Sequence, residues 1–225
     1  MKKNICLTLM IIAVLGIAAP ASAWVTTNFD TGWQTYSLTA GPSGFTGTAG
    51  FVVSCQGGLS LNSYLLLDNL SQCGQVGNES FETGTYAGYS LVDLPVGHGI
   101  SYGFALTGPI DGYYPTAGNY MSVQISQSEN TNGFLNAYGS PGTVGSILET
   151  AISLTAGQQF TFDWAFLAGN FGDFSLFYLK DSAGNVIFQD GLGQAKEVPA
   201  PTPATALLFG SGLIGLTIWR KFMKT

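Results

Sequence analysis

Short runs of strand-like sequence recur along most of this chain and constrain its fold more than any other feature. They are rich in β-branched and aromatic residues, and turn clusters such as residues 41–44 and 182–185 separate them. The runs cover residues 24–29, 33–39, 50–55, 63–68, 86–94, 99–107, 119–126, 147–154, 158–168, 173–180 and 185–190. Because no helical pattern interrupts them, they predict an all-β fold built as an antiparallel sandwich or barrel.

Residues 158–168 show the pattern most clearly. Four large rings, Phe160, Phe162, Trp164 and Phe166, alternate with smaller residues that include Asp163. A period of two sends the rings to one face of a strand and Asp163 to the other, which predicts a strand between a core and a polar surface. The following turn and the alternating run 173–180 predict a hairpin.

The N-terminus has the features of a secretory signal peptide. Two lysines precede an apolar run over residues 5–19, and Ala21 and Ala23 provide the small-residue pattern that signal peptidase accepts. We therefore expect residues 1–23 to be removed, leaving Trp24 as the new N-terminus. The alternative, an N-terminal membrane anchor, is less favoured because the apolar core is short.

A second apolar segment lies near the C-terminus. Residues 204–219 would form a helix of roughly 24 Å, slightly short of a usual membrane span. Prolines precede this segment, and Arg220, Lys221 and Lys224 form a basic tip that would stay on the cytoplasmic side. This segment predicts a transmembrane helix that stops translocation.

Between the two apolar segments the chain is strongly acidic. Lys180 and Lys196 are the only basic residues of the body, residues 24–197, which contains all 13 of the chain's acidic residues. Nucleic acid is excluded as a partner because phosphate binding needs a basic surface. An anionic membrane surface is disfavoured for the same reason, whereas cations, neutral sugars and polar matrix remain possible partners.

Cysteine usage agrees with export. After signal removal the chain keeps Cys55 and Cys73, and in an oxidising compartment we expect a disulfide worth about 3 kcal/mol by loop entropy. The alternative, two ligands of a metal site, lacks further His or Cys ligands.

Three segments of the body together resemble a known kind of module. They are NFDTGWQTYS (28–37), YYPTAGNYMSVQIS (113–126) and the stretch 147–179 that contains TAGQQFTFDW. Their order and character are similar to the jelly-roll-like modules of bacterial surface proteins that carry a PEP-CTERM tail. The resemblance implies an antiparallel β-sandwich of jelly-roll type over residues 24–197.

The C-terminal segment, residues 198–225, resembles the PEP-CTERM sorting signal itself. Val198, Pro199, Ala200 and Pro201 stand where the family has its Pro-Glu-Pro motif, and the apolar helix and basic tip follow. The resemblance implies Sec export in a Gram-negative bacterium, a pause in the inner membrane, and cleavage by an exosortase. Ala200 replaces the usual glutamate; without cleavage the protein would stay a single-pass anchored surface protein.

Candidate catalytic patterns are weak. Ser101 lies in a G-x-S-x-G pattern, but strand and turn sequence follows it, and His98, the only histidine, precedes it. Residues 210–215 match G-x-G-x-x-G inside the apolar tail, outside any βαβ context. Four carboxylates are available for acid-base chemistry, but nothing in the sequence pairs them, and each is expected to be a solvated strand or turn residue: Asp111, Glu149, Asp163 and Asp173.

The sequence predicts no cofactor, and a structural calcium ion is the least implausible ligand. Oxygen-rich loops of an acidic exported sandwich supply the hard ligands that Ca²⁺ prefers. Asp30, Asp163 and Asp173 are the candidate ligands, although no EF-hand loop is present.

The sequence therefore predicts a non-enzymatic cell-surface or extracellular-matrix protein that meets signal peptidase, an exosortase-like enzyme and the inner membrane. Two alternatives stay open. One is a carbohydrate-binding module that uses exposed aromatic residues on extracellular polysaccharide, and the other, less favoured, is a secreted hydrolase.

Overall fold

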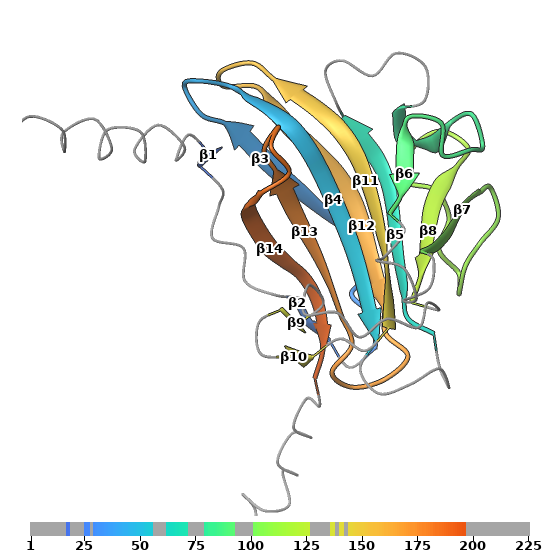
Figure 1. Ribbon diagram of the computed structural model, residues 1–225. Helices are drawn as coiled ribbons and strands as arrows, with labels where there is room; N and C mark the ends of the chain where they lie inside the picture. Colours follow the sequence, from blue (N-terminus) through green and yellow to red (C-terminus); the bar gives the residue numbers. More distant parts are fainter. Residues whose placement is uncertain are drawn as a thin grey trace, which may run out of the picture.

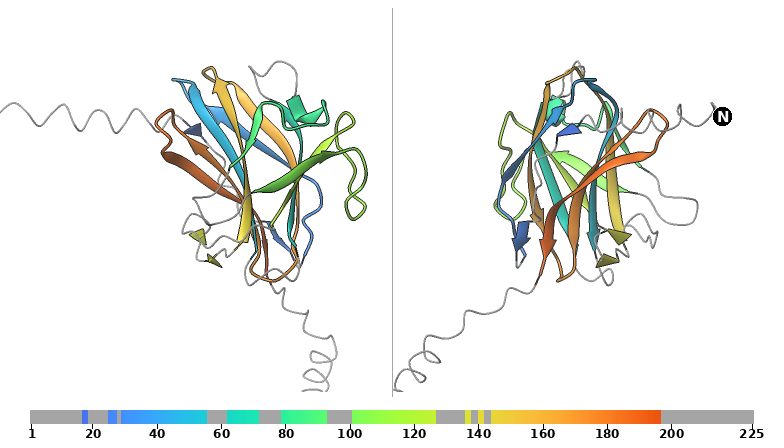
Figure 2. Two further views of the ribbon diagram at one scale, coloured as in Figure 1. Left: turned by 45° about the vertical axis from the view of Figure 1, so that its right-hand side comes forward. Right: turned by 90° about the vertical axis from the view of Figure 1, so that its left-hand side faces the viewer.

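The computed structural model describes residues 17–18, 25–27, 29–55, 62–71, 79–92, 101–126, 136–137, 140–141 and 144–196. This part of the chain is all-β, with two six-stranded sheets and, as its one helical element, the short 3-10 turn η2 (Glu79–Phe81). The predicted all-β class is confirmed, and the two sheets lie face to face in a β-sandwich-like arrangement (Figures 1 and 2).

Sheet A has the order β1 (Ile17–Ala18), β3 (Gln34–Ala40), β12 (Gln159–Leu167), β5 (Tyr64–Ser71), β8 (Met121–Ile125), β7 (Tyr102–Leu106). Sheet B has the order β2 (Val25–Thr27), β14 (Val186–Ala195), β13 (Phe174–Lys180), β4 (Phe45–Cys55), β11 (Val144–Leu154), β6 (Tyr89–Leu91). The strands β9 (Asn136–Ala137) and β10 (Ser140–Pro141) pair with each other. Neighbouring strands are antiparallel except β14 and β2, which are parallel.

Aromatic side chains from both sheets form the centre of the core. Phe162 of sheet A meets Phe51 and Phe177 of sheet B at ring-centroid distances of 5.0 and 5.2 Å. Tyr36 stacks on Phe162 at 5.0 Å, and its hydroxyl donates to Asp190 of sheet B at 2.9 Å. Such offset and edge contacts add to the free energy gained by burying the rings.

The alternation predicted for β12 is confirmed. Phe160, Phe162 and Phe166 are fully buried and Trp164 nearly so, all within the core between the sheets. Asp163 lies on the opposite face of the strand and is half-buried.

The predicted hairpin between β12 and β13 is wrong. β12 pairs with β3 and β5 in sheet A, whereas β13 pairs with β14 and β4 in sheet B. The connecting residues 168–173 therefore cross from one sheet to the other. Alternation within a strand reports which side chains share a face, but the choice of pairing partner depends on contacts distant in sequence.

The alternating residues of β13 divide between the two faces of sheet B. Phe177 and Leu179 face the core, while Phe174, Leu176 and Tyr178 form a second buried cluster on the other face of sheet B. Both faces of β13 are therefore buried.

Each predicted strand run contains a strand, but several strands extend further than their runs. β4 begins at Phe45 and β14 continues to Ala195 through glycine-containing sequence. Gly47 shows why such sequence is needed, because a Cβ there would lie 2.1 Å from the Lys180 carbonyl oxygen. β1 lies inside the predicted signal peptide and pairs with Thr39 and Ala40 of β3.

One end of the sandwich collects several chain segments. β4 ends there at Cys55, β12 ends at Leu167, β13 begins at Phe174 and β14 ends at Ala195; we call it the Ala195 end (the lower end in Figure 1). Within the described residues, no helix has the length and apolar character needed to cross a membrane.

Candidate functional site

The outer face of sheet A carries a polar network that involves the three sequence segments of the resemblance. Residues 107–120, which connect β7 to β8, contribute Ile110 and Tyr113 to an apolar cluster with Leu66 and Val123 on this face. We call residues 107–120 the β7–β8 loop.

Asp68 of β5 binds the backbone of this loop through hydrogen bonds. Its carboxylate is fully buried, and Oδ2 accepts hydrogen bonds from the backbone N–H groups of Thr116 and Ala117. Oδ1 accepts from the Asn69 N–H and the Ser80 hydroxyl, each at 2.7 Å. Hydrogen bonds to a charged acceptor are stronger than neutral ones, so this buried carboxylate fixes the loop and η2 together.

Asp163 lies directly across from Asp68 on the neighbouring strand β12. The hydroxyl of Thr116 is within hydrogen-bond distance of both carboxylates, 2.8 Å from Asp163 Oδ2 and 3.1 Å from Asp68 Oδ2. Since a hydroxyl has one proton, it donates to one of them at a time. Asp163 also accepts from the Thr35 hydroxyl at 2.7 Å and the Asn69 amide at 3.2 Å. We call Asp68, Asp163 and Thr116 the aspartate clasp.

A bulge in β5 makes this arrangement possible. Between the pairs Asp163–Asp68 and Thr161–Ser71, β5 contains one residue more than β12. Asn69 occupies the bulge with a left-handed backbone (φ 50°), which asparagine tolerates better than most residues. Its side chain is thereby directed to Asp163.

Glu82 holds the next turn of the loop. Its carboxylate accepts from the backbone N–H groups of Asn119 at 2.8 Å and Tyr120 at 3.4 Å. Gly118 has φ 63°, and a Cβ there would lie 2.2 Å from Glu82 Oε1. Glycine is favoured at position 118 by its left-handed backbone, and a Cβ there would also displace the Glu82 carboxylate that holds the loop.

Asp30 anchors the start of the same loop. Its Oδ1 accepts from the Tyr113 hydroxyl and from the Gly32 N–H, and the Tyr113 ring packs edge-on against Trp33 at 5.8 Å. Burial, followed by the hydrogen bond to Asp30 and its negative charge, raises the pKa of Tyr113 to about 12.

The three sequence segments behind the resemblance thus meet on one face. The first contributes Asp30, the second contributes Tyr113 and Thr116, and the third contributes Asp163. These residues attach the β7–β8 loop to sheet A. Their identities and spacing in the three segments therefore have a structural explanation.

Asp173 needs a correction, because it was expected to be solvated and is fully buried. At the Ala195 end its Oδ2 accepts from the Ser63 hydroxyl at 2.5 Å and the Asn170 N–H at 2.7 Å. Burial, reinforced by Asp173, raises the pKa of the nearby Cys55 thiol to about 11. Cys73 lies outside the described residues, so the disulfide stays a prediction.

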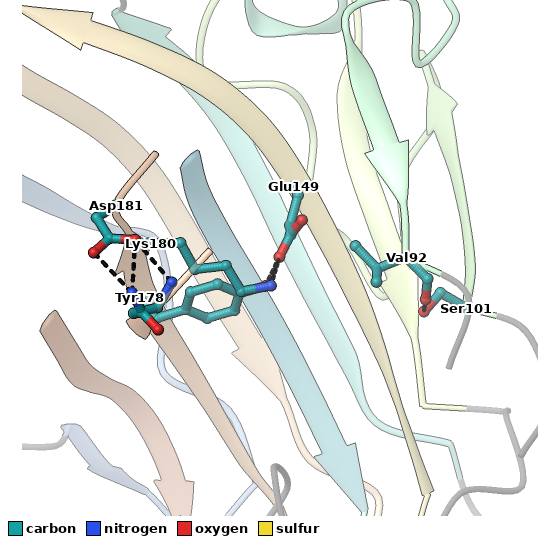
Figure 3. A network of polar contacts seen from close by, with 7 residues as sticks. Val92, Ser101, Glu149, Tyr178, Lys180 and Asp181 are labelled. Carbon is teal, nitrogen blue, oxygen red and sulfur yellow. Dashed lines mark hydrogen bonds and ion pairs between the residues drawn. The ribbon is translucent and has the colours of Figure 1, made fainter. Parts of the chain in front are cut away.

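Glu149 and Lys180 form an ion pair at 2.5 Å on the outer face of sheet B. Figure 3 shows Lys180 reaching Glu149 beside the Tyr178 ring, whose hydroxyl also donates to Glu149. Burial, together with this carboxylate, raises the pKa of Tyr178. Asp111, by contrast, is exposed in a turn.

Ser101 lies in a different environment from that of a nucleophile elbow. Its hydroxyl donates to the Val92 carbonyl at 2.8 Å, as Figure 3 shows, and accepts from the Ile147 N–H at 2.9 Å. Strand β7 follows it directly, as the sequence predicted, and His98 lies outside the described residues.

The predicted calcium ligands are held by separate partners: Tyr113 and Gly32 for Asp30, Thr35 and Asn69 for Asp163, and Ser63 for Asp173. In the part of the chain that the structure describes, no group of three or more His, Cys, Asp or Glu side chains is placed to hold a metal ion. Calcium binding stays a prediction.

The predicted processing sites cannot be placed. Ala21 and Ala23, the tail motif from Val198 to Pro201, and the basic tip of Arg220, Lys221 and Lys224 lie outside the described residues.

Sequence reasoning missed Asp68 and Glu82. A signal for Asp68 was present, because it ends the apolar run of residues 64–67 inside a strand, where a buried charge needs partners. Nothing in its neighbouring sequence distinguishes Glu82 from a solvated glutamate.

Four of the large exposed apolar side chains form two pairs elsewhere on the described surface. Tyr102 and Phe104 alternate on β7, 46% and 41% exposed. Phe29 and Phe171 are 45% and 47% exposed at the Ala195 end. Comparison of the chain with family models, with curated proteins and with solved structures gives no match.

Proposed function

We propose that this chain is an exported, non-enzymatic protein of the cell surface or extracellular matrix. In this proposal the signal peptide starts translocation, the C-terminal helix holds the chain in the inner membrane, and an exosortase cleaves near residues 198–201. The body remains outside as a jelly-roll-type sandwich.

The observation that carries the proposal is the structural role of the carboxylates around the β7–β8 loop. Asp68, Glu82 and Asp163 each accept hydrogen bonds from their own chain and so hold the β7–β8 loop on sheet A. The buried Asp68 carboxylate has both oxygens bonded and is removed from solvent. Carboxylates that could act in catalysis thus have a structural role. This supports a body that is displayed outside the cell and a tail that determines where the protein is sent.

The jelly-roll type is supported by the arrangement of the strands. Sequential strands repeatedly change sheets: β3 to β4, β4 to β5, and β12 to β13. Crossing between two face-to-face sheets is typical of jelly rolls.

Mass spectrometry of the protein recovered from envelope and culture medium tests the proposal. We expect a mature N-terminus at Trp24 and a C-terminus near residues 198–201. In a strain without an exosortase the tail should be retained and the protein should stay with the membrane. A full-length chain found in the cytosol would refute the proposal.

A second candidate function, binding of a neutral glycan, is favoured by the aromatic pair on β7. Register places Tyr102 beside Ile125 and Phe104 beside Val123 on the outer face of sheet A. The absence of lysine and arginine from Trp24 to Leu179 fits a neutral rather than an anionic polysaccharide. Saturable binding on a glycan array that is lost in Tyr102→Ala but kept in Val186→Ala would support this role; no binding would remove it.

A further inference from the structure

We propose that the Ala195 end of the sandwich faces the membrane, and that the Phe29–Phe171 pair docks into the bilayer interface while the tail is inserted. This inference rests on the proposed function and adds to it an orientation of the body and a second membrane contact.

The two rings form one exposed apolar feature. Their centroids are 4.8 Å apart and each ring is nearly half exposed. Their backbones are fixed to the sheets at this end: Ala168 donates to the Phe29 carbonyl at 2.7 Å, and Gly172 donates to the Ala195 carbonyl at 2.8 Å. The pair is thus presented by ordered backbone next to the point where β14 ends.

The length of the connection to the predicted helix limits how far this end can lie from the membrane. Eight residue steps separate Lys196, the last described residue, from Ala204, and a proline-rich extended chain gains about 3.1 Å per residue, or about 25 Å in all. The β14 strand alone is roughly 30 Å long. The Ala195 end is therefore held near the bilayer, and the far end, where β14 starts at Val186, points away from it.

The chemistry of this end fits a zwitterionic lipid surface. Phenylalanine rings are among the side chains that interfacial segments insert between headgroups and acyl chains. Two rings bind weakly alone, but the tether converts their contact into an intramolecular one at high effective concentration. Asp30 adjoins Phe29 and Lys196 follows Ala195, both exposed, so this end carries charges of both signs, which suits a zwitterionic headgroup.

Tryptophan quenching by brominated lipid tests the inference. The tail-bearing protein is purified from a bacterium that exports it but lacks an exosortase, and is reconstituted in phosphatidylcholine vesicles brominated near the headgroup. We expect the tryptophan added in Phe171→Trp to be quenched. Val186→Trp is the matched control, because Val186 is similarly exposed, at 41%, at the opposite end of β14. Phe29→Trp provides an independent second reporter.

The native Trp219 separates the possible failures, because it lies in the predicted helix. Because Trp219 ends the predicted helix beside the basic tip, headgroup-brominated lipid should quench it in the unsubstituted protein. Quenching of Trp219 with no further quenched component in Phe171→Trp and Phe29→Trp would overturn this inference alone. Absence of both signals would overturn the anchored intermediate as well. A blue shift of the added tryptophans without lipid quenching would mean that the pair packs against a second copy of the chain, which also overturns the inference.

Discussion

Asp68→Asn tests whether the buried Asp68 carboxylate stabilises the β7–β8 loop, or whether repulsion from the neighbouring Asp163 carboxylate outweighs its hydrogen bonds. An asparagine has nearly the same shape, but one of its two oxygen positions becomes an NH₂ donor. In either orientation that donor meets a backbone N–H that now lacks an acceptor: those of Thr116 and Ala117 on one side, or that of Asn69 on the other.

The structure gives the size of the effect. Leaving a buried donor unsatisfied costs about 1–3 kcal/mol, and hydrogen bonds to a charged group contribute more than neutral ones. We therefore expect Asp68→Asn to lower the free energy of unfolding by about 3 kcal/mol, since at least one half-buried amide loses its acceptor and the remaining hydrogen bonds to this buried group lose its charge. For a body of this size that corresponds to a fall in Tm of roughly 6–12 °C.

Equilibrium urea unfolding followed by tryptophan fluorescence measures this change, and amide hydrogen exchange at Thr116 and Ala117 locates it. Glu82→Gln is the matched control, because Glu82 is exposed and a rotated amide keeps one of its two backbone hydrogen bonds; we expect a loss below about 1 kcal/mol. If repulsion between Asp68 and Asp163 dominated instead, Asp68→Asn would stabilise the protein. That gain, or a loss no larger than that of Glu82→Gln, would refute the reasoning.

Three further predictions concern other parts of the body. Gln124 is fully buried, and neither of its side-chain amide atoms has a partner among the described residues. Gln124→Met should therefore raise the free energy of unfolding in urea by about 1–3 kcal/mol. A lower free energy of unfolding would mean that the amide is hydrogen-bonded. The pKa of Tyr113 is raised to about 12. The contribution of Tyr113 to the free energy of unfolding should therefore be complete below the ordinary tyrosine pKa and be lost as the pH rises towards 12. An ultraviolet titration compared with that of Tyr113→Phe should show this late ionisation. A Cβ at Gly50 would lie 2.0 Å from the buried Tyr178 ring, so Gly50→Ala should destabilise by about 1–3 kcal/mol, whereas Gly108→Ala, with open space around it, should be close to neutral by thermal unfolding.

The strands were predictable because their signal is local. Alternation along β12 placed Phe162 in the core and Asp163 on the opposite face before any contact was known. Alternation did not predict the β12–β13 connection correctly. It identifies which side chains share a face of a strand, but not which strands pair with one another. Consecutive strands there belong to different sheets.

The aspartate clasp was only half predictable. The sequence singled out Asp163 and the segment that contains Thr116, but it could not bring them together across 47 residues. Asp68 was missed because its role depends on a bulge at Asn69 and on a loop that returns to cover it.

By itself the sequence determined the all-β class, the position of most strands and the acidic character of the body, because these follow from residue types and spacings within a few residues of one another. Only the tertiary structure decided which strands pair, which carboxylates are buried, and that Phe29 and Phe171 share one exposed end. Those features arise where distant segments pack together, and local propensity carries no information about that packing.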